Sequence, residues 1–327
     1  MTKILHLLTE RDTDIGNHLL TLLPAYSSCY TPQVLLPNNS PLLYLLENAG
    51  IPVDTYTEIR RVKNHIRQLR PDILHTHSFI ADRVTGKYGR VHTQHTLPDI
   101  GRFARLLYGL GDRVIATTNA VQDNLSAMGV PDIRLVYDGT DIVQHYSQQQ
   151  VMQLRQKLDI PQDYFVVLFL GTLTPEFEFV LESAREMPYN VILLVTNASH
   201  EMREQAKKLR NVRFIDCDHS LILSITNVQL CCHNTQDQIL PQLLAGMSAR
   251  IPTICNNFDR YIVQDKQNGL VVPANDAQAL DDAITMLKDD DALYKTLSER
   301  AWSYYSTRFT TQKMVDETEK TYRELIK

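Results

Sequence analysis

Short runs of apolar residues alternate along this chain with longer stretches whose apolar residues recur at helical spacing. In the first half the apolar runs lie at 4–8, 33–36, 73–75, 90–93 and 114–117, and the amphipathic stretches at 17–23, 41–49, 58–70, 79–87, 99–110 and 119–128. A second series of apolar runs follows at 165–170, 191–196, 212–215, 228–231 and 253–255. These runs are continuous rather than alternating, which is typical of strands buried on both faces. The pattern predicts an α/β fold of two domains, each a parallel sheet covered by helices.

A polar segment at 145–150 and a segment at 158–161 that ends in Pro161 separate the two series. Polar and proline-containing segments of this kind mark loops and domain boundaries. We therefore expect an amino-terminal Rossmann-like domain over residues 1–150 and a carboxy-terminal one from residue 151. Asn275 and Asp276 are suited to cap a helix, and the chain reads as helical from there to its end.

The composition is that of a soluble globular protein, with 43% hydrophobic and 22% charged residues. No run approaches the ~18 apolar residues of a membrane-spanning helix, and the first apolar run is too short for a signal peptide. The five cysteines are odd in number and lack the spacing of a zinc site, which favours reduced side chains. These features indicate a cytoplasmic protein. The net charge of −5 argues against a nucleic-acid partner.

Several segments, in order along the chain, resemble the motifs of one enzyme family. They are the strand ends PDILHTH (71–77) and VHTQH (91–95), the turn LVYDGTD (135–141), the strand FLGTL (169–173), the helical segment DQILPQLLAGMSARIP (237–252) and the segment YIVQDKQNGLVVP (261–273). With the opening strand and Gly16, they resemble the family 4 glycosyltransferases of the GT-B fold. The resemblance implies two facing Rossmann-like domains, over 1–150 and 151–308, and a last helix at 309–327 that crosses back onto the first domain.

In that family the nucleotide-sugar donor binds to the second domain and the acceptor to the first, in the cleft between them. The anomeric configuration is retained and no metal ion is required. The resemblance thus implies a glycosyltransferase that uses a nucleotide sugar as substrate, needs no cofactor, and acts on a saccharide or lipid-linked acceptor of a surface polysaccharide or glycoconjugate.

The donor-binding residues implied by the resemblance come from three segments. Asp237 matches the first acid of the nucleotide-sugar signature and would face the transferred sugar, as a catalytic residue. A helix predicted to begin near Leu240 would offer its amino terminus to the diphosphate. Asp237 could instead be an ordinary acid at a helix amino terminus, and Gly16 a simple helix entry. The expected donor-binding residues are Gly16, Gly171, Thr172, Leu240, Pro241, Gln242 and Leu243.

Three positions depart from the family pattern on the donor side. Ala245 occupies the place of the second Glu, whose carboxylate binds the ribose hydroxyls in the family. Thr172 and Glu176 stand where the family carries the Arg and Lys that neutralise the diphosphate. Because charge-assisted hydrogen bonds contribute about 1.5–3 kcal/mol each, we expect weaker donor binding than is usual for the fold.

Four histidines follow or end two of the predicted strands: His75, His77, His92 and His95. His95 matches the family histidine that points toward the sugar, so we predict a catalytic role in donating a hydrogen bond or transferring a proton. His77 is predicted to bind the acceptor. Each of the four could also be a histidine whose ring is satisfied within the fold. His-x-His after a strand is also a zinc pattern of hydrolases, but the further ligands of such sites are missing, so no metal site is predicted.

Basic residues recur at helical spacing on one predicted helix: Arg60, Lys63, Arg67 and Arg70. Such a face suits either solvent or peripheral contact with an anionic membrane, where lipid-linked acceptors lie. Two functions of the chain therefore stay open. It is either an active glycosyltransferase or a catalytically degenerate subunit that binds a saccharide or a partner glycosyltransferase.

Overall fold

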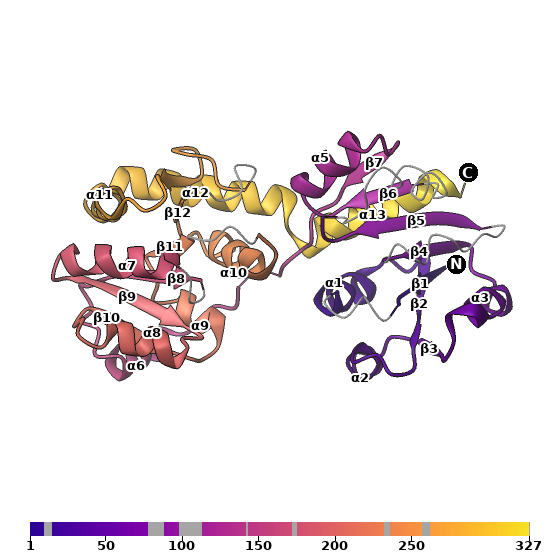
Figure 1. Cartoon of the computed structure of the whole chain (residues 1–327), viewed down its shortest axis with the longest axis horizontal. Coiled ribbons are helices and arrows are strands. Elements are labelled where there is room, and N and C mark those ends of the chain that lie inside the picture. The colour runs from indigo at the N-terminus through magenta and orange to yellow at the C-terminus, as the bar shows by residue number, and fades with distance from the viewer. Residues whose placement is uncertain are drawn as a thin grey trace. The chain divides into compact units, whose positions relative to one another are not determined.

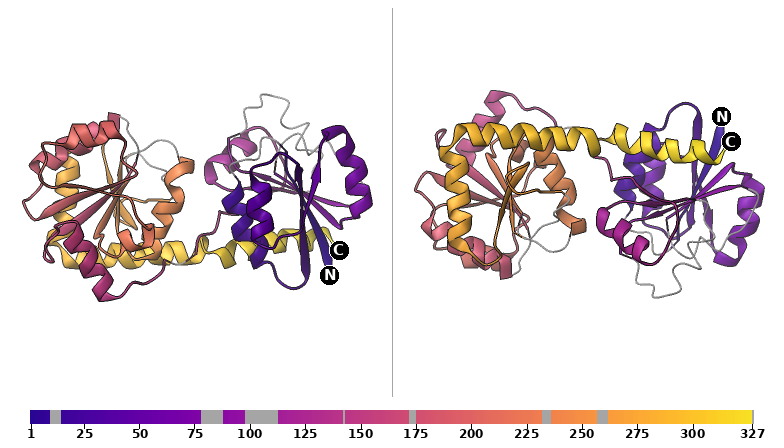
Figure 2. Two further views of the ribbon diagram at one scale, coloured as in Figure 1. Left: turned by 90° about the horizontal axis from the view of Figure 1, so that it is seen from below. Right: turned by 90° about the horizontal axis from the view of Figure 1, so that it is seen from above.

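A computed structural model of the chain describes residues 1–9, 15–77, 88–97, 113–141, 143–171, 175–231, 236–256 and 262–326, with the backbone alone for 175–176 and 236–239. The chain divides into two compact units (Figures 1 and 2). The amino-terminal unit comprises Met1–Gly139 and Arg308–Lys327, and the carboxy-terminal unit comprises Thr140–Thr307. The division falls before residue 150, so the helix α6 (Gln148–Lys157) belongs to the carboxy-terminal unit.

The amino-terminal unit is built on a 7-stranded sheet of order β3-β2-β1-β4-β5-β6-β7, in which each described pair of neighbours is parallel. The order reverses between β1 and β4. Ligands of open α/β sheets bind beyond the carboxyl ends of the strands at such a switch point. The strands are β1 (Thr2–Leu7), β2 (Tyr30–Pro37), β3 (Val53–Tyr56), β4 (Ile73–Thr76), β5 (Gly89–Gln94), β6 (Arg113–Ala116) and β7 (Ile133–Leu135).

Helices cover both faces of this sheet because successive strand residues point to opposite faces. Ile4 of β1 packs in one cluster with Met314 near the carboxyl end of the chain, whereas Leu5 packs in another with Val62 and Ile66. The described helices are α1 (Gly16–Leu22), α2 (Leu42–Asn48), α3 (Val62–Leu69), α5 (Asn119–Ala127) and α13 (Thr311–Leu325), with the 3-10 turns η1 (Leu23–Ala25) and η2 (Ile59–Arg61).

The carboxy-terminal unit repeats the architecture on a 6-stranded parallel sheet of order β10-β9-β8-β11-β12-β13. Its switch point lies between β8 and β11. The strands are β8 (Phe165–Leu170), β9 (Val191–Thr196), β10 (Val212–Ile215), β11 (Val228–Cys231), β12 (Thr253–Asn256) and β13 (Gly269–Val272). The further helices are α7 (Pro175–Glu186), α8 (His200–Ala206), α9 (His219–Leu223), α10 (Gln236–Ser248), α11 (Ala277–Asp289) and α12 (Asp291–Arg308).

The last helix, α13, belongs to the amino-terminal unit (Figure 2). Thr310 caps it by accepting a hydrogen bond from the backbone N–H of Lys313 at 3.2 Å. Met314, Val315 and Tyr322 are fully or almost fully buried in the same cluster as the sheet residues. The backbone N–H of Ser27 donates to Glu319 Oε1 at 2.7 Å. The expectation that the carboxy-terminal helix crosses back onto the first Rossmann-like unit is therefore confirmed.

All the predicted strands are present, and three further ones, β3, β7 and β13, were not predicted. Asp276 caps α11 as expected, accepting from the backbone N–H of Ala279 at 2.9 Å. The predicted helices at 79–87 and 99–110 lie outside the described residues. Within the described ranges, no helix has the length and apolar character needed to cross a membrane.

Candidate functional site

Histidines gather at the carboxyl ends of β1 and β4, at the switch point of the amino-terminal unit. His6 of β1 and His75 of β4 are partners in the strand register, with ring centroids 4.7 Å apart. His77 follows β4 and stacks on His75 with centroids 4.6 Å apart. Since Ile4 and Ile73 face the cluster that contains α13, the three histidines, two or four residues further along their strands, face the same side.

A continuous chain of side-chain hydrogen bonds runs through these rings. His95 Nε2 lies 3.1 Å from His77 Nδ1, and His77 Nε2 lies 2.9 Å from His6 Nδ1. His6 Nε2 lies 3.2 Å from the hydroxyl of Tyr26, which lies 2.7 Å from the hydroxyl of Tyr322 on α13.

The series of hydrogen bonds continues from Tyr322 into the core. The Tyr322 hydroxyl lies 2.6 Å from His75 Nδ1, and His75 Nε2 lies 2.7 Å from Thr93 Oγ1. A neutral imidazole has one donor and one acceptor nitrogen. All the links from His95 to Thr93 can therefore be satisfied at once, with every ring protonated on Nε2.

Burial keeps these histidines neutral. Burial, and then the neighbouring His18, lower the pKa of His6 to about 3. The pKa of His95 is also lowered to about 3, by burial first and then by His18, against an opposing effect of Asp138. The pKa values of His75 and His77 lie well below the ordinary value, mainly because of burial and then because of the other histidines. Near neutral pH the cluster therefore carries hydrogen bonds rather than positive charge.

His18 on α1 also contacts these rings. Its ring centroid lies 4.6 Å from that of His95, and its Nδ1 lies 2.6 Å from Asp138 Oδ1. Burial opposes ionisation of Asp138, but its electrostatic interaction and hydrogen bond with His18 more than offset this and lower the pKa of the carboxyl. The other nitrogen, His18 Nε2, is buried and has no hydrogen-bond partner among the described residues.

The four histidines predicted from the sequence differ in exposure. His95 is partly exposed, whereas His75, His77 and His92 are buried. His92 is held by Thr76 at 3.0 Å and Gln94 at 3.1 Å. Both ring nitrogens of His77 are engaged, so it supports His95 and has no nitrogen left over for an acceptor in this arrangement.

Gly16 is the first residue of α1 and is buried. A Cβ at this position would lie 2.8 Å from Leu42 Cδ2 of α2. The close approach of α1 and α2 explains the glycine without a ligand, and its predicted contact with the donor stays a prediction.

On the donor side, α10 begins at Gln236, so the expected start near Leu240 is wrong. Pro241 lies inside the helix. The first four N–H groups of a helix have no partner within it. In α10 these lie in the turn that begins at Gln236, whereas Leu240, Gln242 and Leu243 lie further along, with Leu243 fully buried.

Two further residues of the donor side are described by the structure, Gly171 and Ala245. Gly171 directly follows β8, and a Cβ there would lie 2.3 Å from Cζ of the Phe169 ring. Ala245 is partly exposed on α10, and its carbonyl accepts from Ser248 Oγ at 2.7 Å. Thr172 and the side chains of Glu176 and Asp237 lie outside the described residues.

The predicted basic face lies on η2 and α3. Arg60 and Arg61 pair with Glu58 at 2.7 and 3.1 Å. Lys63, Arg67 and Arg70 are exposed, as is half of the Ile59 side chain.

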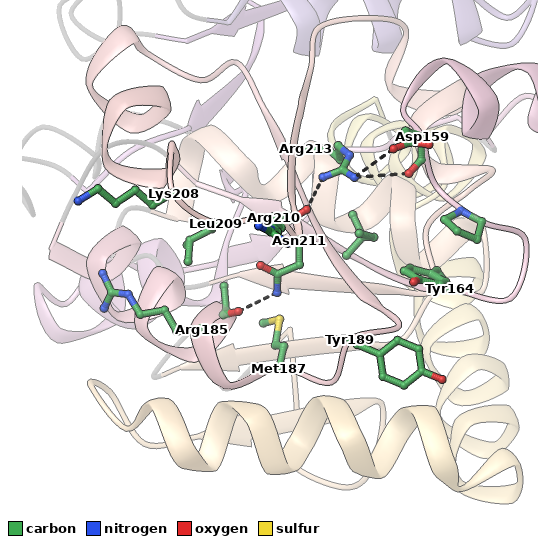
Figure 3. A pocket seen from close by; sticks show the side chains of 13 residues that line it. Asp159, Tyr164, Arg185, Met187, Tyr189, Lys208, Leu209, Arg210, Asn211 and Arg213 are labelled. Atoms are coloured by element: carbon green, nitrogen blue, oxygen red, sulfur yellow. Dashed lines mark hydrogen bonds and ion pairs between the residues drawn. The ribbon is translucent and has the colours of Figure 1, made fainter.

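A pocket of about 580 Å³ opens in the carboxy-terminal unit (Figure 3). It lies near the amino ends of β9 and β10, opposite to the strand ends that carry Gly171 and the start of α10. Arg213 in its wall donates to the carbonyls of Leu158 at 2.8 Å and Arg210 at 2.6 Å, and Asn211 donates to that of Ala184 at 2.7 Å. These groups hold neighbouring loops together, and we assign the pocket no role.

Sequence reasoning did not single out His6, His18, Asp138 or Tyr322. Asp138 lies within the LVYDGTD turn, but its partner His18 is distant in sequence and lies on a helix with no recognisable motif. Only the parallel topology brings them together.

Comparison with known proteins supports the resemblance. Residues 36–144 match the family model described as Glycosyltransferase Family 4. An exopolysaccharide phosphotransferase of Streptomyces coelicolor is 32% identical over 87 residues, which cover 26% of this chain and 9% of that relative's length.

Solved structures share the fold over almost the whole chain. HepE of Anabaena in complex with UDP has a TM-score of 0.81 at 18% identity, covering 99% of this chain and 100% of that one. A glycosyltransferase from Rickettsia africae has a TM-score of 0.82 at 14% identity, covering 100% and 99%. HepE has also been solved in complex with UDP-glucose, with a TM-score of 0.75 at 19% identity over 99% of this chain and 100% of that one. The fold is therefore the GT-B fold, and the family 4 resemblance expected from the sequence is confirmed.

Proposed function

We propose that this chain, a GT-B protein of the glycosyltransferase family 4 type, transfers a sugar from a nucleotide-sugar donor to a hydroxyl of a saccharide or lipid-linked acceptor. The observation that carries the proposal is His95, partly exposed at the carboxyl end of β5 inside the region that matches the family. The similarity to an exopolysaccharide phosphotransferase, and to HepE solved in complex with UDP-glucose, favours a role in surface polysaccharide or glycoconjugate synthesis.

The amino-terminal unit supplies the proposed acceptor side. His95 Nε2 is engaged with His77, which leaves Nδ1 as the nitrogen that meets a sugar hydroxyl. His77, His6 and the tyrosines behind it fix the ring, so the hydrogen bond to the sugar requires little further ordering. A neutral imidazole with a protonated Nδ1 donates to a hydroxyl oxygen, and the opposite tautomer accepts its proton.

The carboxy-terminal unit supplies the proposed donor side. The N–H groups of the first turn of α10, which begins at Gln236, and the positive end of the α10 dipole suit the diphosphate. Gly171 and Thr172 would lie against the phosphates, and Asp237 would face the transferred sugar. The proposed reaction retains the anomeric configuration, with the nucleotide sugar as the only cosubstrate and no metal ion in the chemical step. Catalysis then rests on positioning and on stabilising the leaving diphosphate.

The test begins with binding. UDP, GDP, CMP and their sugars are screened by thermal shift, since a ligand that binds only the native state raises the melting temperature. We expect one nucleotide class to raise it. Turnover of the matching nucleotide sugar is then compared for His95→Ala and for His200→Ala, an exposed histidine of α8.

Removing a positioned general acid or base lowers turnover by about 100-fold or more. We expect that loss for His95→Ala and an unchanged rate for His200→Ala. Equal rates for the two variants would refute the role of His95. Binding of no nucleotide at all would overturn the transferase proposal and favour the degenerate subunit, which should then co-purify with a partner glycosyltransferase.

The exposed face of Lys63, Arg67, Arg70 and Ile59 is the proposed contact with an anionic membrane. Basic residues near such a surface contribute about 1 kcal/mol each. In a flotation assay the protein should rise with phosphatidylglycerol vesicles. The double variant Lys63→Glu and Arg67→Glu should stay in the bottom fraction. Equal flotation with neutral phosphatidylcholine vesicles would contradict the proposal.

A further inference from the structure

We infer that His18, His77 and His95 form a binding site for a divalent transition-metal ion of the zinc class. One ligand nitrogen from each of the three lies within 4.8 Å of the others. The inference goes beyond the proposed function and shares His95 with it; with an ion on Nε2, the His95 ring keeps its proton on Nδ1 and donates it to a sugar hydroxyl rather than accepting one.

The distances fit a single ion. Zinc binds imidazole nitrogen at about 2.0–2.1 Å, so two nitrogens on one tetrahedral ion lie roughly 3.3 Å apart. His77 Nδ1 and His95 Nε2 are 3.1 Å apart and already point at each other. An ion bound to both displaces the proton that they share, which moves to His95 Nδ1, and both rings turn so that their lone pairs meet beside the line that joins the two nitrogens.

His18 supplies the third nitrogen. Its Nδ1 is occupied by Asp138 at 2.6 Å, which leaves Nε2 as the ligand atom. That atom is buried and unpaired among the described residues, although a buried polar atom is normally satisfied. A bound ion removes this deficit.

The groups behind the ligands match a metal site as well. A metal-bound histidine usually donates its other N–H to a carboxylate, carbonyl or other acceptor, which fixes its tautomer. His18 has the Asp138 carboxylate on Nδ1, and His77 donates from Nε2 to His6 Nδ1 at 2.9 Å. Beyond His6, the hydrogen bonds continue through Tyr26 and Tyr322 to His75, with each donor on the side nearer the ion.

A second trio, His6, His75 and His77, also has ligand nitrogens within 4.8 Å of one another. In that trio both nitrogens of His6 are bonded, to His77 and Tyr26, and both nitrogens of His75, to Tyr322 and Thr93. All three rings are fully or almost fully buried. An ion there would break several of these hydrogen bonds. An ion bound by His18, His77 and His95 breaks only the one between His77 and His95.

The chemistry of the ligands sets the class of ion. Neutral imidazole suits zinc, copper, nickel and iron, whereas magnesium and calcium prefer oxygen. With three histidines as the described ligands, a coordination position is left for water or a further group.

The experiment titrates metal into the full chain after treatment with a chelator and desalting. Zn²⁺ is followed by calorimetry, and Co²⁺ by its visible absorption, which is strong for four- or five-coordinate nitrogen sites. We expect one ion per chain and no comparable binding of Mg²⁺. X-ray absorption of the zinc form should show imidazole nitrogens at about 2.0–2.1 Å.

Three variants locate the ion. His18→Gln and His95→Gln should each weaken Zn²⁺ binding at least 100-fold, and Asp138→Asn about 10–100-fold, the usual effect of removing a group that orients a ligand. His200→Gln is the matched control. Circular dichroism checks the folding of each variant. The Co²⁺ absorption of the wild-type chain tests the inference even where a variant fails to fold.

Absence of a Co²⁺ band and of Zn²⁺ heat in the wild-type chain would overturn the inference. So would unweakened binding in His18→Gln and His95→Gln, or a loss that appears in His6→Gln alone, which would place the ion at the inner trio. No donor or acceptor is present in these measurements, so their outcome is separate from that of the transferase assay.

Discussion

The substitution Tyr322→Phe tests how the last helix is held on the amino-terminal unit. It keeps the ring, which is fully buried, and removes only the hydroxyl. That hydroxyl lies 2.7 Å from the hydroxyl of Tyr26 and 2.6 Å from His75 Nδ1. No cavity of ring size forms, so the effect isolates the polar contacts.

The size of the effect follows from the partners left behind. A buried donor or acceptor without a partner costs about 1–3 kcal/mol. Tyr26 retains His6 at 3.2 Å, and His75 retains Thr93 at 2.7 Å, so each partner loses one of its two contacts. We expect Tyr322→Phe to lower the free energy of unfolding of the amino-terminal unit by about 2–4 kcal/mol. A domain of ordinary stability, about 5–15 kcal/mol, stays folded after such a loss.

The assay must separate the two units. The single tryptophan, Trp302, lies on α12 in the carboxy-terminal unit, so its fluorescence reports on that unit alone. Hydrogen exchange with mass spectrometry at increasing urea follows peptides of β1, β4 and α13 instead. Tyr44→Phe, at a 71% exposed position on α2, is the control. The reasoning is refuted if the two variants unfold at the same urea concentration, or if Tyr322→Phe shifts the Trp302 transition instead.

Three further predictions concern packing, pH and the donor. A Cβ at Gly246 of α10 would lie 2.0 Å from Gln229 Oε1 of β11, so Gly246→Ala should destabilise the carboxy-terminal unit by about 1–3 kcal/mol; an unchanged Trp302 urea midpoint would contradict this. Because the pKa of His6 falls from 6.5 to about 3 on folding, the unfolded chain binds more protons between these values. In the presence of a chelator, the amino-terminal unit should therefore lose up to about 1.4 kcal/mol per pH unit for each such histidine as the pH falls below 6.5, and exchange-detected stability that is flat from pH 6.5 to 5 would rule this out. Ala245→Glu should strengthen nucleotide binding by about 1–3 kcal/mol and Ala245→Gln by less, whereas calorimetry that finds tight nucleotide-sugar binding by the unaltered chain would show that other groups hold the ribose.

The sheets could be predicted because most of their strands are continuous apolar runs. Two of the three strands that were not predicted lack that signal, whereas β13, with sequence GLVV, is a short apolar run that was overlooked. The strand β3, with sequence VDTY, contains two polar residues in four, and β7 is only three residues long. Such short edge or near-edge strands are stabilised by pairing with a neighbour, for example β3 with β2 and β7 with β6, and pairing is not visible in local sequence.

The start of α10 was predicted near Leu240, too late in the sequence. Proline is disfavoured inside a helix, so the local sequence around Pro241 does not indicate a helix that runs through it. The helix nevertheless extends back to Gln236. The consequence is chemical, since the amino terminus of the helix moves from Leu240 to Gln236, and so to the turn that contains Asp237.

The candidate site was predictable only in its part nearest the strand motifs. His77 and His95 follow strands at spacings that match the family, so sequence reasoning identified them. His18 and Asp138 are separated by 120 positions, and Tyr322 and His75 by 247. Neither pair carries a local signal, and each forms because the parallel sheet and the returning helix α13 bring distant segments to one face.

This arrangement makes the last helix part of the site. The hydroxyl of Tyr322 joins Tyr26 to His75, and through Tyr26 it touches the same chain of rings that ends at His95. If Tyr322 sets which nitrogen of each ring carries the proton, its removal frees His6 and His77 to exchange tautomers, and the Nε2–H of His95 loses a fixed acceptor in His77. The same Tyr322→Phe variant should then change the nitrogen chemical shifts of the His95 ring, whereas Tyr44→Phe should not. Unchanged His95 shifts in Tyr322→Phe would mean that the helix stabilises the unit without ordering the site.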